Sequence, residues 1–333
     1  MTIKIGINGF GRIGRMTLRS IIENNRKDIE VVAINNKSNA EISSFLLKHD
    51  TIHGPLKNKI IHSNQLISID EKKINMIQES EISNIDWGKY KVDIVLECTG
   101  KFNSKEKSEQ HIKSGAKKVI VSAPCKDANS IVFGVNHKNI NLKDKVISAA
   151  SCTTNCLAPV AKVINDSFQI ERGFMTTIHS YTNDQRLLDN SHKDLRRARA
   201  AANSMIPTTT GATKSLGDII PELKGKIEGI SIRVPTSNVS LVEFVFSSNK
   251  NLTTEKINDS FVKASKSSLL NILDVNDQPL VSSDFNHNPH SAIVDLTLTK
   301  VVENKMAKVS AWYDNEWGFA SRMCDLANYF GKI

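Results

Sequence analysis

The sequence predicts an α/β fold, in which an N-terminal doubly wound domain precedes an α+β domain built on a largely antiparallel sheet. Three observations support this prediction. Short apolar strands alternate with helical segments over residues 3–150, a pattern typical of a parallel sheet covered by helices. A glycine-rich turn joins the first strand to the first helix. Beyond residue 170, long β-rich segments follow one another with few helices between them, which is typical of an antiparallel sheet.

The length and composition are those of a globular protein of about two domains. The chain has 333 residues and a net charge of +9, but its basic residues are scattered, so we expect no primary role in nucleic-acid binding. Five cysteines, at 98, 125, 152, 156 and 324, show no zinc-site spacing, so we expect free thiols and no metal site. Because we find neither a signal peptide nor an apolar run of ~20 residues, we expect a cytoplasmic protein with no membrane partner.

The glycine-rich turn has the pattern of a dinucleotide-binding fingerprint. Residues 4–8 predict a strand, Gly9, Gly11 and Gly14 form G-x-G-x-x-G, and residues 12–22 carry a helical apolar stripe. Such glycines allow a tight turn, a close approach of the backbone to a pyrophosphate, and close packing of helix on strand. The first domain is therefore predicted to be of Rossmann type and to bind a nicotinamide dinucleotide.

The second strand, residues 30–35, leaves the choice of dinucleotide open. An acidic residue is expected after it, where a carboxylate binds the ribose 2′-hydroxyl of NAD, but Asn36 occupies that position. A neutral amide does not repel a 2′-phosphate, and Lys37 or Lys48 could attract one. The sequence thus predicts NAD as the cofactor, with NADP as an alternative.

The remaining elements follow the same alternation and then change character. We expect strands over 92–98 and 117–121, a helix over 104–114 between them, and a polar insertion with a hairpin over 50–90. In the second half, we expect a strand over 173–179, a loop over 205–211, and a C-terminal helix over 317–330 that folds back onto the first domain. The other expected strands are 229–234, 240–246, 292–298 and 307–313.

Cys152 is the candidate nucleophile. It lies between a buried strand, residues 146–150, and a helix expected over 157–164, in which Pro159 fits only the first turn. A helix N-terminus lowers a thiol pKa toward neutrality, although a small buried cysteine explains the residue equally well. His179, at the end of a strand in the same half, is the candidate base, and a structural histidine is the alternative.

Taken together, the motifs resemble those of phosphorylating glyceraldehyde-3-phosphate dehydrogenases over essentially the whole chain. The matching segments are Ile7–Arg15, Glu97–Gly100, Ser151–Leu157, His179–Gln185, Lys193–Ala200, Pro207–Ala212, Arg233–Thr236 and Trp312–Gly318. The resemblance implies that Cys152 attacks the aldehyde of glyceraldehyde 3-phosphate and that His179 accepts the hydroxyl proton. A thioester then forms after hydride transfer to the cofactor, and inorganic phosphate releases 1,3-bisphosphoglycerate, in glycolysis or gluconeogenesis.

The resemblance also implies the remaining site residues. Thr182 and Arg233 would bind the substrate phosphate, and hydroxyls, N–H groups and a guanidinium would bind the attacking phosphate. That second set is Ser151, Thr153, Thr210, Gly211 and Arg197, with Arg199 as the alternative to Arg197. The cofactor set is Gly9, Gly11, Arg12, Ile13, Gly14, Asn36, Ser122 and Asn315. The implied domains are 1–151 with 316–333 for the dinucleotide, and 152–315 for catalysis.

Three other functions stay open at this point. The first is an NADP-preferring form working in the gluconeogenic direction, suggested by Asn36 and Lys37. The second is erythrose-4-phosphate dehydrogenase, which shares the nucleophile segment. The third, from a different class, is an RNA-binding module, suggested only by the positive charge. The family is usually a homotetramer, with the segment around 181–203 at a subunit interface, so we expect the same assembly.

Overall fold

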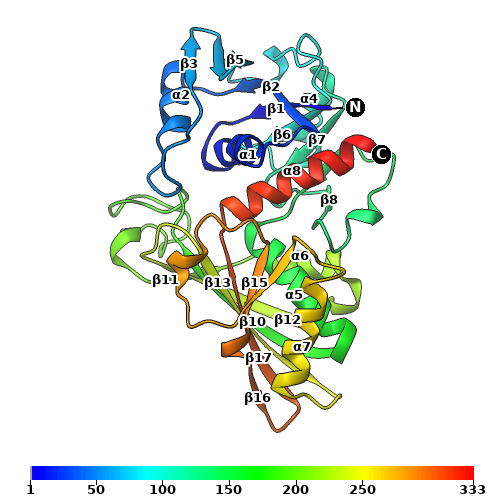
Figure 1. Ribbon diagram of the computed structural model, residues 1–333. Coiled ribbons are helices and arrows are strands. Elements are labelled where there is room, and N and C mark those ends of the chain that lie inside the picture. The colour runs from blue at the N-terminus through cyan, green and yellow to red at the C-terminus, as the bar shows by residue number, and fades with distance from the viewer. Residues whose placement is uncertain (1) are drawn as a thin grey trace. The chain divides into compact units, whose positions relative to one another are not determined.

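Strand β1 (Ile3–Asn8) lies at the centre of a nine-stranded sheet with the order β3-β4-β5-β2-β1-β6-β7-β9-β8. The computed structural model describes residues 2–333 and divides into two units; this sheet belongs to the first, which comprises the chain up to Ile131, His137–Ala150 and Ala320–Ile333 (Figure 1). The other strands are β2 (Ile29–Asn35), β3 (Ile60–Ser63), β4 (Leu66–Ile69), β5 (Lys72–Ile77), β6 (Ile94–Glu97), β7 (Lys118–Val121), β8 (Asn129–Ser130) and β9 (Val146–Ser148).

The first strand–turn–helix unit is as predicted. Helix α1 (Arg12–Glu23) follows β1 after the glycine turn, and β1 pairs in parallel with both β2 and β6. The residue 50–90 insertion does contain a hairpin, β3–β4, but the prediction missed that β5 extends the main sheet by pairing in parallel with β2. It also missed α2 (Ala40–Lys48). The helix expected over 104–114 is two short pieces, α3 (Lys105–Ser108) and α4 (Gln110–Lys113).

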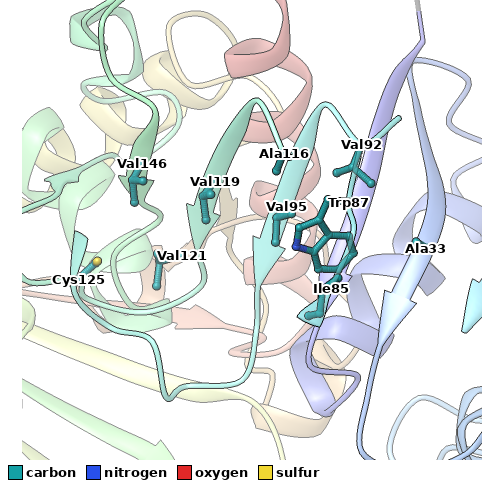
Figure 2. Packing of buried hydrophobic residues seen from close by; sticks show 10 residues of the cluster. All are labelled: Ala33, Ile85, Trp87, Val92, Val95, Ala116, Val119, Val121, Cys125 and Val146. Carbon is teal, nitrogen blue, oxygen red and sulfur yellow. The ribbon is translucent and has the colours of Figure 1, made fainter. Parts of the chain in front are cut away.

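Apolar side chains on neighbouring parallel strands form a core of the first unit. Val95, Val119 and Val146 come from β6, β7 and β9 and belong to one cluster with Trp87, which has no exposed surface and lies beside Val95 in Figure 2. A fully buried tryptophan contributes about 3–5 kcal/mol to the free energy of unfolding. At the C-terminus, the Lys118 ammonium donates to the Phe330 carbonyl at 2.7 Å, which holds the end of α8 (Trp317–Lys332) against β7.

The second unit, Val132–Asn136 with Ser151–Phe319, contains an eight-stranded sheet. Most of its strand pairs are antiparallel, as predicted, while β10–β12 and β14–β15 are parallel. Its strands are β10 (Ile170–Ser180), β11 (Ile206–Thr209), β12 (Ile227–Val234), β13 (Ser240–Ser248), β14 (Leu273–Asn276), β15 (Ala292–Asp295), β16 (Lys300–Val302) and β17 (Met306–Tyr313). Its helices are α5 (Cys152–Phe168), α6 (Ala212–Ile219) and α7 (Thr254–Ser265).

Three predictions for this unit differ from the structure, the first two for identifiable reasons. The helix expected to begin near residue 157 begins at Cys152, so Pro159 lies in its interior, where it removes one backbone hydrogen bond from a helix that is mostly buried. The loop expected over 205–211 contains strand β11, because Pro207 is compatible with a strand at the edge of a sheet. The strand expected over 292–298 ends at Asp295 and continues as a 3₁₀ turn.

Candidate active site

Cys152 is the first residue of α5, and local hydrogen bonds explain why the helix begins there. The Ser151 hydroxyl accepts a hydrogen bond from the Thr154 backbone N–H at 3.0 Å, which makes Ser151 the N-cap. Ala150 has a left-handed φ of +57°, so the chain turns sharply just before the helix. The thiol therefore lies at a helix terminus that carries partial positive charge.

His179, near the end of β10, faces this thiol. Its Nε2 lies 3.4 Å from Cys152 Sγ, and its Nδ1 lies 2.7 Å from the Ser180 carbonyl oxygen. Nδ1 therefore has an acceptor beside it, and also a donor, because the guanidinium of Arg233 can only donate. We assign the imidazole proton to Nδ1 on the shorter contact, that with the carbonyl oxygen, which leaves the lone pair of Nε2 directed at the thiol. Arg233 on β12 donates to the same carbonyl at 3.1 Å, and its Nη1 lies 2.8 Å from Nδ1. The structure thus brings the predicted nucleophile and base together.

The electrostatics of this pair differ from the sequence-based expectation. Burial raises the pKa of the Cys152 thiol, and it outweighs the Arg233 charge and the Thr153 hydrogen bonds, which lower it. The expected lowering toward neutrality is therefore wrong here, because loss of water disfavours the thiolate more than the helix terminus favours it. Burial, followed by the Arg233 charge, lowers the pKa of His179 to about 3. A lone thiolate and a lone imidazolium are both disfavoured, whereas proton transfer from Sγ to Nε2 leaves the pair without net charge.

Tyr313, at the end of β17, was not singled out from the sequence, although it lies against both halves of the pair. Its hydroxyl lies 2.9 Å from the hydroxyls of Thr153 and Thr177, and its ring packs edge-on to the His179 imidazole. The Thr153 side chain, a candidate phosphate ligand, is therefore buried and bound to Tyr313. The sequence does not indicate the contact between Tyr313 and Thr153, because the two residues are 160 positions apart in the chain.

The candidate phosphate ligands form a second cluster in the same unit. Arg197 donates to the Thr208 hydroxyl at 3.0 Å and to the Thr209 carbonyl at 3.3 Å, so it is held against β11. Thr210 and Gly211 follow β11 directly, and the Thr210 hydroxyl accepts from the Ala212 N–H at the start of α6. Arg197 also pairs with Asp184 at 2.6 Å. Its charge further lowers the pKa of His179, which places it within electrostatic range of the catalytic pair.

Arg199 differs from Arg197 in its surroundings. Its side chain is 67% exposed and pairs with Asp189 at 2.8 Å, whereas the Arg197 side chain is 20% exposed. Thr182 is half-buried, and its backbone N–H donates to the Gln185 side chain at 3.1 Å. Asn315 is 5% exposed, and its Oδ1 accepts from the hydroxyls of Ser180 and Ser240 at 2.9 and 3.0 Å. The amide of Asn315 is thereby held in one orientation.

The glycine turn of the first unit borders a cavity of about 510 Å³, which Gly9, Gly11 and Asn36 help to line. Gly9 has a φ of +92°, and a Cβ on Gly14 would lie 2.3 Å from the Gly9 carbonyl oxygen, so both positions require glycine. A Cβ on Gly11 would meet no atom within 4 Å, which leaves the backbone open to a ligand. No side chain caps α1 at Gly11, so the helix N-terminus can receive a phosphate.

Three other candidate cofactor ligands lie outside the lining of this cavity. Ile13 lies in the first turn of α1, and the Ser122 N–H donates to the Glu97 carbonyl at 3.0 Å. Arg12 forms an ion pair with Asp50. Burial alone would raise the pKa of Asp50, but the Arg12 hydrogen bond and two backbone N–H groups lower it to about 2. Arg12 is therefore oriented by a buried carboxylate at the start of α1.

The other four cysteines differ in their burial. Cys156 and Cys324 are fully buried and Cys125 nearly so, whereas Cys98 is half-buried and lines the cavity beside the glycine turn. Within residues 2–333, no group of three or more His, Cys, Asp or Glu side chains is placed to hold a metal ion. None of the helices in that range is both long and apolar enough to cross a membrane.

Comparison with known proteins gives matches over nearly the whole chain. Residues 3–105 match the family described as glyceraldehyde 3-phosphate dehydrogenase, NAD binding domain, and residues 151–315 match its C-terminal domain. The chain is 50% identical to glyceraldehyde-3-phosphate dehydrogenase of Cereibacter sphaeroides over 334 aligned positions, covering 100% of both chains. It is 49% identical to glyceraldehyde-3-phosphate dehydrogenase 2 of Bacillus subtilis, covering 99% of this chain and 97% of that one. The corresponding enzyme of Xanthobacter flavus is 50% identical, with both chains covered fully.

Proposed function

The chain belongs to the glyceraldehyde-3-phosphate dehydrogenase family, and we propose that it catalyses the phosphorylating oxidation of glyceraldehyde 3-phosphate to 1,3-bisphosphoglycerate. The observation that carries the proposal is the 3.4 Å contact between Cys152 Sγ and His179 Nε2 at the N-terminus of α5. A thiol with a neutral imidazole in reach is an arrangement that activates a nucleophile for covalent catalysis.

The mechanism follows from the positions of these groups. His179 Nε2 accepts the thiol proton as Cys152 Sγ bonds to the aldehyde carbon, and the proton then passes to the new oxyanion. His179 next removes that hydroxyl proton while hydride leaves the same carbon, so the adduct becomes a thioester on Cys152. NAD, when bound, supplies the hydride acceptor. A phosphate oxygen then attacks the thioester carbon, the C–S bond breaks, and the thiolate regains its proton from His179.

Two anion sites are needed for this sequence, and two clusters of donors support them. We assign the substrate phosphate to Thr182 and Arg233, and the attacking phosphate to Thr210, Gly211 and Arg197. Ser151 and the backbone N–H of Thr153 belong with the second site. We choose Arg197 over Arg199 because Arg197 is held against β11 and influences His179, whereas Arg199 is mostly exposed.

The dinucleotide cavity supports NAD binding by the first unit. Its size, the open backbone at Gly11 and the uncapped α1 N-terminus suit a pyrophosphate with its adenosine. Arg12, Ile13 and Gly14 would complete the pyrophosphate turn, Ser122 would contact the cofactor at a strand end, and Asn315 would bind the carboxamide. We accordingly assign residues 1–151 and 316–333 to the cofactor domain and 152–315 to the catalytic domain.

Asn36 and Lys37 both line this cavity, so NADP is the alternative cofactor to be tested against NAD. The deciding experiment follows NADH or NADPH absorbance with glyceraldehyde 3-phosphate and phosphate, and then with erythrose 4-phosphate. We expect phosphate-dependent turnover on the triose. Inactivity with both cofactors would overturn the proposal, and faster turnover on the tetrose would replace it with the erythrose-4-phosphate enzyme. An NADP preference would support the gluconeogenic form.

Two glycine replacements separate folding from cofactor binding. Gly14→Ala should lower the free energy of unfolding by about 1–3 kcal/mol, because its Cβ meets the Gly9 carbonyl. Gly11→Ala should leave the melting temperature unchanged, because its Cβ meets no protein atom, but NAD affinity should fall at least about tenfold. Thermal denaturation and calorimetric titration with NAD measure the two quantities. Unchanged NAD affinity in Gly11→Ala would contradict the pyrophosphate assignment.

We also propose a homotetramer that works in the cytoplasm. Several large apolar side chains between residues 187 and 205 are exposed in the single chain, which supports an interface along this segment. They are Leu187, Leu188, Leu195 and Met205, each more than 70% exposed. The sheet of the second unit has a further half-exposed face, because burial alternates along β13. The free thiols are consistent with a reducing compartment.

A further inference from the structure

No acidic residue stands at the end of β2, where a carboxylate would distinguish the ribose 2′-hydroxyl of NAD from the 2′-phosphate of NADP. Another group in the cavity must therefore make this distinction. Asn36 occupies the position expected for the acidic residue, and its amide is already engaged within the protein. Its Oδ1 accepts from the Phe10 N–H at 3.4 Å, and its Nδ2 donates to the Ser43 hydroxyl at 3.2 Å. Asn36 therefore shapes the turn between β1 and α1 and brings no negative charge to the cavity.

The carboxylate of Glu79, which follows the neighbouring strand β5, lines the same cavity. Glu79 follows β5, which pairs in parallel with β2, and it lines the cavity together with Asn35 and Asn36. The Glu79 side chain is half-buried, and its Oε2 lies 3.5 Å from the Asn84 amide. Its Oε1 accepts no hydrogen bond within residues 2–333, so one oxygen is available to a ligand hydroxyl.

The backbone of Glu79 is fixed to the end of β2 by a reciprocal pair of hydrogen bonds. The Glu79 N–H donates to Asn35 Oδ1 at 2.9 Å, and Asn35 Nδ2 donates to the Glu79 carbonyl at 3.0 Å. The backbone N–H of Asn36 also donates to the Ile77 carbonyl at 3.0 Å. The position of Glu79 is therefore set by the end of β2, although Glu79 follows a different strand, β5.

A buried chain of side chains holds Asn35 in turn. Asn35 Nδ2 donates to Asn8 Oδ1 at 2.7 Å, and Asn8 Nδ2 donates to Glu97 Oε2 at 2.6 Å. Glu97 also accepts from the Thr99 N–H and from His111, whose Nδ1 accepts from the Trp87 indole at 3.0 Å. Because the groups around Glu97 donate to it, Glu97 orients the amides of Asn8 and Asn35 in one direction.

The charges around the cavity favour a role for Glu79 over its neighbours. Lys37, Lys101 and Glu81 also line the cavity, but all three are exposed, so water screens their charges. Glu79 is half-buried on a fixed backbone, so a phosphate dianion nearby would be repelled more strongly than by an exposed carboxylate. A hydroxyl there could instead donate to Glu79 Oε1.

We propose that Glu79, which follows β5, determines the cofactor specificity of this enzyme. Its carboxylate accepts a hydrogen bond from the ribose 2′-hydroxyl of NAD and repels the 2′-phosphate of NADP. The inference rests on the proposed function, in that the cavity holds the adenosine half of the cofactor. Glu79 thus replaces the missing acidic residue at the end of β2.

The test is a calorimetric titration of wild type, Glu79→Gln and Glu81→Gln with NAD and with NADP. Glutamine keeps the shape of the side chain and removes the charge. Glu81→Gln is the matched control, because it removes the same charge from the same cavity at an exposed position. Wild type should bind NAD more tightly than NADP. Glu79→Gln should narrow that ratio at least about tenfold, which is about 1.4 kcal/mol, and Glu81→Gln should change it less than about threefold.

The outcomes distinguish this inference from the function on which it rests. If wild type binds neither dinucleotide, the proposed function fails and the inference with it. If wild type binds NAD but the ratio is unchanged in Glu79→Gln, the inference alone is overturned. An equal change of the NAD-to-NADP affinity ratio in Glu79→Gln and Glu81→Gln overturns the inference as well, because any negative charge in the cavity would then have the same effect. An equal fall in affinity for both dinucleotides in Glu79→Gln would show a structural role only.

Discussion

Cys152→Ser should lose at least about 10⁴-fold in kcat, because every covalent step of the proposed mechanism passes through the sulfur. A serine hydroxyl is far less acidic than a thiol, and the neutral His179, with a pKa near 3, is too weak a base to ionise it. The measurement is the rate of NADH formation with glyceraldehyde 3-phosphate and phosphate. Calorimetric titration with NAD should give an unchanged affinity, which shows that the variant is folded.

Cys156→Ser is the matched control for this prediction. Cys156 lies one turn further along α5, is fully buried, and its thiol lies 3.8 Å from the Ala311 carbonyl oxygen. Burial raises the pKa of its thiol well above the ordinary value, so it has no reactive thiolate at neutral pH. We expect its activity to stay within about tenfold of wild type. If Cys152→Ser retained activity while Cys156→Ser lost it, the nucleophile would have been assigned to the wrong cysteine.

Local sequence patterns predicted the parts of this protein that local physics determines. The three glycines of the first turn are needed within one strand–turn–helix unit, so their spacing was sufficient to identify it. The C-terminal helix was likewise predicted from its own periodicity. The helix α5 begins at Cys152 and not near residue 157, because Ser151 caps it through the Thr154 N–H and the helix tolerates Pro159 in its interior.

The features that could not be predicted depend on contacts between distant segments. Tyr313 contacts Thr153 and Thr177 only because β17, α5 and β10 pack together. Glu97 was known from a motif, yet its partners Asn8 and His111 come from other elements. The pKa of Cys152 also required the structure. A helix terminus can be predicted from sequence, whereas burial of the thiol depends on everything that packs around it.

His179→Asn should lower kcat by about 10²–10⁴-fold and should also change how the Cys152 thiol responds to pH. In wild type, a proton can pass from Sγ to Nε2 across 3.4 Å without creating net charge. In the variant, the thiolate can form only by releasing its proton to solution, and burial raises the pKa for that step. Alkylation of Cys152 by iodoacetamide should therefore be slower at neutral pH and should need more alkaline solution.

The alkylation rate, followed by mass spectrometry from about pH 6 to about pH 10, measures this shift. His62→Asn is the control, since His62 lies exposed on β3 in the other unit and should leave the pH profile unchanged. A His179→Asn profile that coincides with wild type would contradict proton transfer within the pair and leave Cys152 activated by Arg233 and the helix terminus alone.

The acid stability of the same variant gives a second readout with a definite sign. The pKa of His179 is about 3 in the folded chain and about 6.5 when unfolded, so the unfolded chain binds the extra proton between these values. The neutral His179 therefore makes its full contribution to the free energy of unfolding of wild type above about pH 6.5. That contribution is lost as the pH falls toward 3. Asparagine does not titrate, so urea unfolding of His179→Asn should depend less steeply on pH in that window. Parallel curves for the two proteins would mean that the imidazole is already charged when folded, and the base would then have to be reassigned.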